Sequence, residues 1–292
     1  MQDMGVEFLI EYNFKKEEFF KQMLNLNIKS GDTLCINCNL SQFGVIQGYK
    51  RIDYLNLFLD YLGENGTLVA LAYTGVGQGI FSDKNIPYFD GTQKANTGAF
   101  SNIMLKHPEA IRSKHPSNSV VVIGKNAEYI VKNHNETTGA YNFIKPLMEL
   151  DGKILLLGMS DFPGFVTHKV EEDLLLYKQY WNRFFLKVKL EDRKIFYRKD
   201  PGGCSSTFGK LYEFYIKEQK LLAGYVNNAY SLSINAKDAY DIDMKIIKKN
   251  PNILICDNSN CFRCRVSRWK TIWRLPIFIV KKVIKKYILK KV

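Results

Sequence analysis

Residues 151–158 read Asp-Gly-Lys-Ile-Leu-Leu-Leu-Gly, a turn followed by an apolar run that closes on a glycine. Such a run predicts a strand that is buried on both faces, as the strands of parallel sheets are. Similar runs occupy residues 32–36, 67–72 and 119–123, and they alternate with segments of helical apolar spacing at 13–26, 54–62, 97–106 and 128–132. The alternation predicts an α/β fold with a largely parallel central sheet flanked by helices. Further along the chain, residues 184–190 and 195–198 are expected to form a hairpin.

The charge of the chain is concentrated near its C-terminal end. The 292 residues hold 42 Lys+Arg and 29 Asp+Glu, a formal net charge of +13, which by itself suggests a nucleic-acid binder. Eleven of the basic residues lie in residues 263–292, which contain no acidic residue, so residues 1–262 carry a net charge of only +2. This division predicts an α/β domain over 1–262 and a basic tail over 263–292. It argues against nucleic acid as a partner.

The tail has the pattern of a basic amphipathic helix. On a helical wheel, apolar residues such as Ile277, Val280 and Ile284 fall on one face, and lysines cover most of the other. Trp269 and Trp273 precede this segment. Such a helix is typical of segments that lie on an anionic membrane surface, so we expect residues 268–292 to make peripheral membrane contact. The alternative is a helix that docks on the body of the protein or on another subunit.

The N-terminal residues do not read as a signal peptide, and no apolar run reaches about 18 residues, the length needed to span a bilayer. Six cysteines without a secretory signal suggest a reducing compartment. We therefore expect a cytoplasmic protein, either dissolved there or peripheral on the inner face of the cytoplasmic membrane.

His168 and Glu171 are the first candidates for catalysis. They follow the strand predicted at 154–158, and ligand sites in parallel α/β sheets gather beyond the carboxyl ends of strands. If a helix begins near His168, Glu171 at i+3 and Glu172 at i+4 share its face. A carboxylate at one ring nitrogen would fix the tautomer and leave the other nitrogen as a base. The alternative is a solvated helix start whose acids lie near the positive end of the helix dipole.

His115 is a second candidate, because it precedes the strand at 119–123 and Pro116 holds it extended. Its ring and the neighbouring hydroxyls suit ligand binding, although a polar loop entering a strand explains the segment equally well. His107 and His134 are interpreted as surface loop residues.

The cysteines offer one candidate metal site. Cys256, Cys261 and Cys264 form C-x4-C-x2-C, a spacing found among iron–sulfur ligands, whereas Cys204 stands alone. Cys35 and Cys38 fall on a predicted strand, where buried thiols are ordinary. Spacing alone is a weak signal for a metal, so no metal is expected.

Taken together, these segments resemble the aminoglycoside 3-N-acetyltransferase family over roughly residues 28–250. The matching segments occur in the family's order, at residues 31–34, 40–44, 62–69, 89–90, 97–99, 112–119, 150–158, 168–171 and 235–239. The resemblance implies an α/β enzyme that transfers an acyl group directly from a CoA thioester to a primary amine.

The resemblance also implies roles for particular residues. His168 would be the base that removes the amine proton, Glu171 would orient it, and His115 would line the cleft as a third active-site residue. Acetyl-CoA or another short acyl-CoA would be bound by a larger set, which comprises Leu40, Ser41, Phe43, Gly44, Arg112, Ser113 and Ser119.

The form of residues 168–172, His-Lys-Val-Glu-Glu, looks most similar to relatives from surface-polysaccharide gene clusters. A body of charge +2 also suits an anionic substrate better than a polycation. We therefore expect an N-acyltransferase that acts on a nucleotide-linked amino sugar in surface-glycan biosynthesis. One alternative is aminoglycoside acetylation, and another is a non-enzymatic scaffold that binds a membrane or a metal.

Overall fold

The structure is a computed structural model, and it describes residues 14–74, 77–78, 86, 88–159, 164–176, 186–192, 194–197, 204–261, 264, 276–277, 279–281 and 284. A seven-stranded sheet forms its centre, in the order β10-β11-β7-β1-β2-β6-β5. The strands are β1 (Thr33–Cys38), β2 (Thr67–Leu71), β5 (Ile111–Arg112), β6 (Val120–Gly124), β7 (Lys153–Leu157), β10 (Leu222–Val226) and β11 (Ala229–Asn235). The predicted α/β fold is confirmed.

The parallel part of the sheet is its centre, where β1 pairs in parallel with both β2 and β7. The outer strands run antiparallel: β6 against β2, β5 against β6, β11 against β7 and β10 against β11. In each of the pairs β5–β6 and β10–β11, the first strand runs in the direction of the central strands. The second strand reverses and lies between the first strand and the centre, so β6 and β11 oppose their central neighbours. The two-residue β5 is too short for its pattern to reveal this from sequence.

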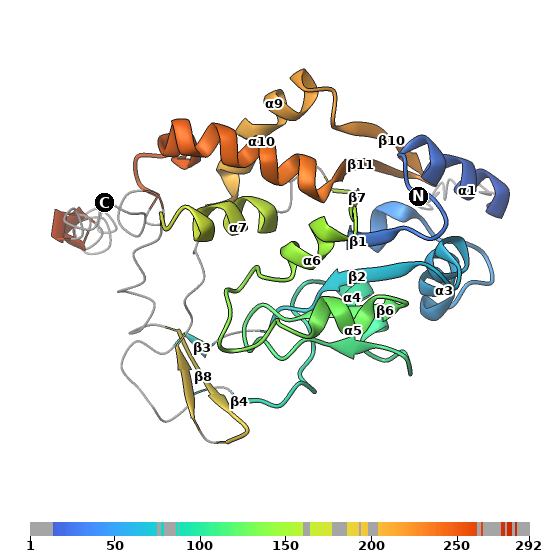
Figure 1. The fold of residues 1–292 in the computed structure, drawn as a ribbon, viewed down its shortest axis with the longest axis horizontal. Coiled ribbons are helices and arrows are strands. Elements are labelled where there is room, and N and C mark those ends of the chain that lie inside the picture. The colour runs from blue at the N-terminus through green and yellow to red at the C-terminus, as the bar shows by residue number, and fades with distance from the viewer. Residues whose placement is uncertain are drawn as a thin grey trace, which may run out of the picture.

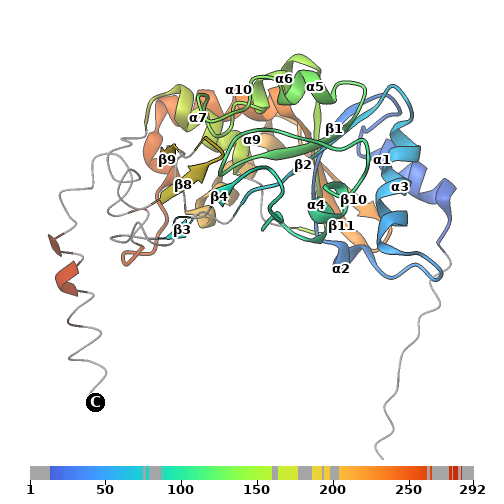
Figure 2. The same ribbon diagram turned by 90° about the horizontal axis from the view of Figure 1, so that it is seen from below.

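Helices cover both faces of the sheet (Figures 1 and 2). One face packs against α5 (Ala127–Val131), α6 (Ile144–Glu149), α7 (Phe165–Asp173) and α10 (Ala236–Lys249). The other packs against α1 (Lys16–Asn25), α2 (Leu40–Phe43), α3 (Arg51–Leu62) and α4 (Ala99–Met104). Successive strand residues alternate between the two cores: Leu34 and Ile36 point to one, and Cys35 to the other.

A smaller sheet lies beside the main one (Figure 1). It contains β3 (Gly77–Gln78), β4 (Tyr88–Phe89), β8 (Leu186–Leu190) and β9 (Ile195–Tyr197). The antiparallel pairing of β8 with β9 confirms the predicted hairpin. After it come η2 (Ser205–Leu211), α9 (Tyr212–Lys217) and, beyond α10, η3 (Pro251–Leu254). Of these, η2 matters most for the site, because it reaches back to α7.

Most of the tail, including Trp269 and Trp273, lies outside the described residues. Six tail residues are described as helical and exposed, namely Pro276, Ile277, Ile279, Val280, Lys281 and Ile284. None of the helices in the described ranges is long and apolar enough to cross a membrane.

Candidate functional site

The candidate site forms at one edge of the sheet because of the strand directions. The carboxyl ends of β7, β1 and β2 meet there, and α7 and α2 follow β7 and β1 directly. The segment before β6 reaches the same edge, because β6 is antiparallel to β2 and Leu71 pairs with Val120. His168, His115 and the loop at residues 40–44 are therefore brought to a single edge.

His168 and Glu171 form a buried pair on α7. The Nδ1 of His168 lies 2.6 Å from Oε2 of Glu171, and the two residues are 9% and 0% exposed. The helix begins at Phe165, so both residues lie inside it and the i+3 spacing places them on one face. Since the ionised carboxylate only accepts hydrogen bonds, Nδ1 carries the proton and Nε2 is the basic nitrogen. This local geometry is the one expected from the spacing.

Two aromatic rings hold the imidazole of His168. Tyr141 lies across it with ring centroids 4.9 Å apart, and Phe208 of η2 meets it edge-on at 5.1 Å. Gly164 permits this approach of Phe208, because a Cβ on Gly164 would lie 2.0 Å from the phenyl ring. The sequence offered no signal for either aromatic contact, since both bring distant segments together.

A second buried carboxyl group lies behind the pair. Asp243 of α10 is 0% exposed and accepts hydrogen bonds from Thr167 Oγ1 at 2.8 Å and Tyr215 Oη at 2.5 Å. Burial, reinforced by the charge of Glu171 and opposed by these two hydrogen bonds, raises the pKa of Asp243 to about 7. Sequence reasoning missed Asp243. The available signal was an acid on the buried stripe of α10, four residues from both Ala239 and Ile247.

His115 lies in a separate buried layer. It is 2% exposed, stacks on His134 at 4.9 Å between ring centroids, and meets Phe196 of β9 at 5.5 Å. Its Nδ1 accepts the backbone N–H of Asn118 at 3.0 Å, which leaves the ring proton on Nε2 in the neutral form.

The interpretation of His134 as a surface residue is wrong, because it is 1% exposed. Its Nε2 donates to the carbonyl oxygen of Ala140 at 3.0 Å, and its Nδ1 accepts from Ser113 Oγ at 2.9 Å. Burial lowers the pKa of His134 to about 4, so the ring is neutral near pH 7. Ala140 accepts from His134, and the next residue, Tyr141, packs its ring on His168. This turn therefore connects the stacked rings of His115 and His134 to His168.

Asn118 is a further residue that the sequence analysis did not select. It is 1% exposed, yet among the described residues neither Nδ2 nor Oδ1 of its side chain has a hydrogen-bond partner. A buried amide without a partner carries a desolvation penalty of about 1–3 kcal/mol. Beside His115 at this edge of the sheet, it is a candidate to hydrogen-bond a bound substrate.

Three of the residues expected to bind CoA have partners within the chain. The guanidinium of Arg112 donates to the carbonyl oxygens of Ala72, Gly91 and Gln93 and to Ser119 Oγ. Ser113 accepts from the N–H of Val120 at 2.9 Å. Ser119 donates to the oxygen of Ala72 at 2.6 Å. These bonds fix the edge of the site, and a contact of these residues with CoA stays a prediction.

The other expected CoA residues form the short helix α2 and its end. Asn39 caps it, because its Oδ1 accepts the backbone N–H of Ser41 at 3.3 Å and also Ser41 Oγ at 2.7 Å, and Phe43 is 0% exposed in the core. Ser41 is exposed, and Val45 just beyond Gly44 is 88% exposed. Gly44 has φ +100°, a left-handed conformation that favours glycine. An exposed hydroxyl beside an exposed apolar side chain suits the mixed polar and apolar arm of an acyl-CoA.

Comparison with known proteins decides the family. The family model described as "Aminoglycoside 3-N-acetyltransferase" matches residues 35–248. The chain belongs to the aminoglycoside 3-N-acetyltransferase family. This match confirms the family resemblance that was expected from the sequence. It also confirms the expected activity class, an acyl-CoA-dependent N-acetyltransferase with acetyl-CoA as its co-substrate.

Individual proteins that are similar to this aminoglycoside 3-N-acetyltransferase family member also point to the same family. Aminoglycoside N(3)-acetyltransferase IV from Salmonella sp is 23% identical over 257 residues, which cover 84% of this chain and 92% of the relative. Aminoglycoside N(3)-acetyltransferase III, also from Salmonella sp, is 24% identical and covers 77% of this chain and 88% of the relative. The crystal structure of AAC(3)-IVa as apoenzyme has a TM-score of 0.71 at 19% identity, covering 88% of this chain and 97% of that one.

The expected nucleotide-linked amino sugar of surface-glycan biosynthesis is wrong. The family model and the curated relatives are aminoglycoside 3-N-acetyltransferases, and the particular likeness to surface-polysaccharide enzymes finds no support among them. The physical error lay in using the +2 charge of residues 1–262 to judge the substrate. A net charge does not report the charge at one cleft.

Proposed function

We propose that this protein transfers the acetyl group of acetyl-CoA to a primary amine of an aminoglycoside. The observation that carries the proposal is the buried His168–Glu171 pair at the carboxyl edge of the sheet, in a chain of this family. Relatives with the same fold support both substrates. AAC(3)-IVa has been solved in complex with a gentamicin, with a TM-score of 0.71, and AAC-IIIb with CoASH, with a TM-score of 0.68.

His168 is proposed as the general base. The amine nitrogen bonds to the thioester carbonyl carbon, the amine proton passes to Nε2 of His168, and the carbon–sulfur bond breaks so that CoA leaves as a thiolate. The imidazolium then returns the proton to this sulfur, which gives the free CoA thiol and neutral His168. Before that return, Glu171 stabilises the imidazolium through its 2.6 Å contact with Nδ1. Tyr141 and Phe208 keep the ring in place without supplying charge. The carboxylate of Glu171 is buried at the ring, so its stabilising effect is screened little by water.

The loop at residues 40–44 is proposed to hold the acyl-CoA arm. Acetyl-CoA supplies the activated acetyl group, and the exposed Ser41 and Val45 give its arm a polar and an apolar contact. Asn118 is proposed as a hydrogen-bonding group for the substrate, because its buried amide has both a donor and an acceptor available within the described ranges.

The test is an acetylation assay on the purified protein with acetyl-CoA and gentamicin, apramycin or sisomicin. Release of the CoA thiol and a mass gain of one acetyl group on the antibiotic are the expected results. His168→Ala should abolish turnover while the circular dichroism and Tm stay close to wild type, and His107→Ala, on a half-buried loop, is the matched control. Near-normal turnover by His168→Ala would remove the base assignment. If the protein acetylates another amine but none of these antibiotics, the proposed aminoglycoside substrate is refuted.

We also infer that the tail contacts an anionic membrane surface. Ile277, Val280 and Ile284 of the expected apolar face are 55%, 56% and 41% exposed, so the described part of this face is not covered by the body. Vesicles containing phosphatidylglycerol should bind the full chain in a salt-sensitive way, and vesicles of phosphatidylcholine alone should bind it weakly. Deletion of residues 268–292 should remove the binding while acetylation continues. Unchanged vesicle binding after the deletion would refute the role of the tail.

A further inference from the structure

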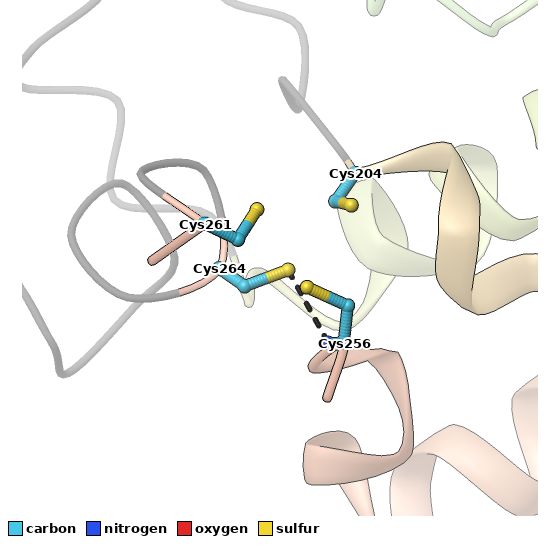
Figure 3. Close-up of side chains that lie close together, drawn as sticks. All are labelled: Cys204, Cys256, Cys261 and Cys264. Carbon is cyan, nitrogen blue, oxygen red and sulfur yellow. Dashed lines mark hydrogen bonds between the residues drawn. The ribbon is translucent and has the colours of Figure 1, made fainter. Parts of the chain in front are cut away.

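Four of the six cysteines converge at one place outside the His168 site. The Sγ atoms of Cys204, Cys256, Cys261 and Cys264 all lie within 4.8 Å of one another. Figure 3 shows their side chains facing one another from two separate segments. Cys204 directly precedes η2, and the other three follow η3. Cys256 and Cys264 are 6% and 0% exposed, and Cys204 and Cys261 are half-buried.

The distances suit a single metal ion. A tetrahedral zinc site has Zn–S bonds of about 2.3 Å, which place its four sulfurs about 3.8 Å apart. Thiols already within 4.8 Å need only small side-chain movements to reach that arrangement. An iron–sulfur cluster would spread its cysteines around a core of several atoms, so the compact set favours one ion.

The surrounding backbone is arranged as a ligand loop. The N–H of Cys256 donates to Sγ of Cys264 at 3.4 Å, a contact that stabilises negative charge on a metal-bound sulfur (Figure 3). Between these two cysteines, Asn258 forms a tight turn: its Oδ1 accepts from the N–H of Asn260 at 2.9 Å, and its carbonyl accepts from the N–H of Cys261 at 3.1 Å. This turn brings Cys261 back toward Cys256.

The two cysteine-bearing segments are also joined beside the cluster. Nζ of Lys210 in η2 donates to the carbonyl oxygen of Ile255 at 3.1 Å and to Oδ1 of Asp257 at 3.0 Å. These bonds hold η2 and the segment after η3 together, next to Cys256. Cys35 and Cys38 differ from the cluster: they lie on β1, where burial raises the pKa of the Cys35 thiol to about 12.

We propose that Cys204, Cys256, Cys261 and Cys264 bind a structural zinc ion that fastens η2 to the segment after η3. Three of the four cysteines lie beyond residue 248, where the family match ends. The ion takes no part in acetyl transfer. Its effect on the reaction is indirect, because η2 carries Phe208, which packs edge-on against the ring of His168.

Metal content is the first test, and it does not depend on activity. The full chain, purified without chelators and without a metal-affinity tag, is expected to contain about one zinc per chain by elemental analysis. Cobalt supplied in place of zinc should give the intense sulfur-to-cobalt absorption of a tetrahedral thiolate site. Wild-type protein without stoichiometric zinc would overturn the proposal. So would iron with the visible absorption of a cluster, or two disulfides found among the four cysteines by mass spectrometry.

Variants separate ligation from general folding. Cys261→Ala should lose the zinc, whereas Cys261→His, which offers a different zinc ligand, should retain it, and Cys38→Ser should keep the wild-type metal content. If Cys261→Ala does not fold, a strong chelator applied to wild-type protein serves instead. It should release about one zinc and lower Tm by several degrees, and added zinc should restore Tm. Equal zinc in Cys261→Ala and wild type would refute the site, whatever the acetylation assay shows.

Discussion

The unfolding free energy of Asp243→Asn, measured relative to that of wild type, should increase as the pH rises from 5 to 8. The Asp243 carboxyl group is fully buried, and its pKa is raised from 3.8 to about 7, chiefly by burial. In the folded chain it therefore holds a proton that the unfolded chain has already released. A carboxyl group with a raised pKa contributes stability that is complete below pH 3.8 and is lost as the pH rises to about 7.

The magnitude follows from the pKa difference. Each pKa unit corresponds to about 1.4 kcal/mol, so the loss in wild type between pH 5 and 8 is about 2–3 kcal/mol. Asparagine does not titrate, and its amide can keep the contacts with Tyr215 and Thr167, because both hydroxyls can also accept. The difference in unfolding free energy between Asp243→Asn and wild type should therefore grow by that amount over this range.

Urea denaturation at pH 5, 6, 7 and 8, followed by circular dichroism, measures this difference. Asp241→Asn on the same helix is the matched control, because its side chain is exposed and pairs with Lys237 at the surface. Its unfolding free energy should follow the wild-type pH dependence. Parallel curves for Asp243→Asn and wild type would refute the reasoning, because they would mean that the buried carboxyl titrates alike in both states.

Three further predictions concern the site. Glu171→Gln should lower kcat by at least about 10²-fold with little change in KM for acetyl-CoA, because a neutral amide does not stabilise the imidazolium of His168; an unchanged kcat would contradict this role. Asn118→Ala should lower kcat/KM about 10-fold and change the unfolding free energy by less than about 1 kcal/mol, since its buried amide has no partner to lose among the described residues; a large loss of stability would instead make it structural. Burial lowers the pKa of His134 to about 4, so wild type should lose up to about 3 kcal/mol of stability as the pH falls from 6.5 toward 4. His134→Gln does not titrate in this range and should not show this loss. Urea titrations at pH 4.5 and 7.5 measure it, and an identical pH dependence in variant and wild type would count against it.

Sequence predicted the parts of the structure that depend on neighbours along the chain. The run at 151–158 forms β7, and the i+3 spacing of His168 and Glu171 gives a 2.6 Å contact, because one turn of helix fixes that geometry. The antiparallel direction of β6 was missed, because it depends on a two-residue partner strand. His134 was misplaced for a related reason. Its burial comes from Ser113 and Ala140, and only Ala140 is near it in sequence.

The cysteines show the same limit. The spacing of Cys256, Cys261 and Cys264 was visible in the sequence, but three cysteines do not complete a tetrahedral site. The fourth, Cys204, arrives from the segment before η2, a distance along the chain that no spacing rule covers. Long-range packing brought the fourth cysteine of the proposed zinc site, just as it brought Phe208 to His168.

The basic composition of the chain is compatible with a polycationic substrate once the charges are placed. Eleven of its basic residues lie in residues 263–292, so the net charge of +13 does not report the charge near His168. On α7, the helix that carries His168, acidic residues outnumber basic ones. Glu171 and Glu172 lie on the same helix, and Lys169 is paired with Asp173 at 2.5 Å. For the proposed aminoglycoside substrate, these carboxylates would favour the approach of an amine to His168, whatever the net charge of the chain.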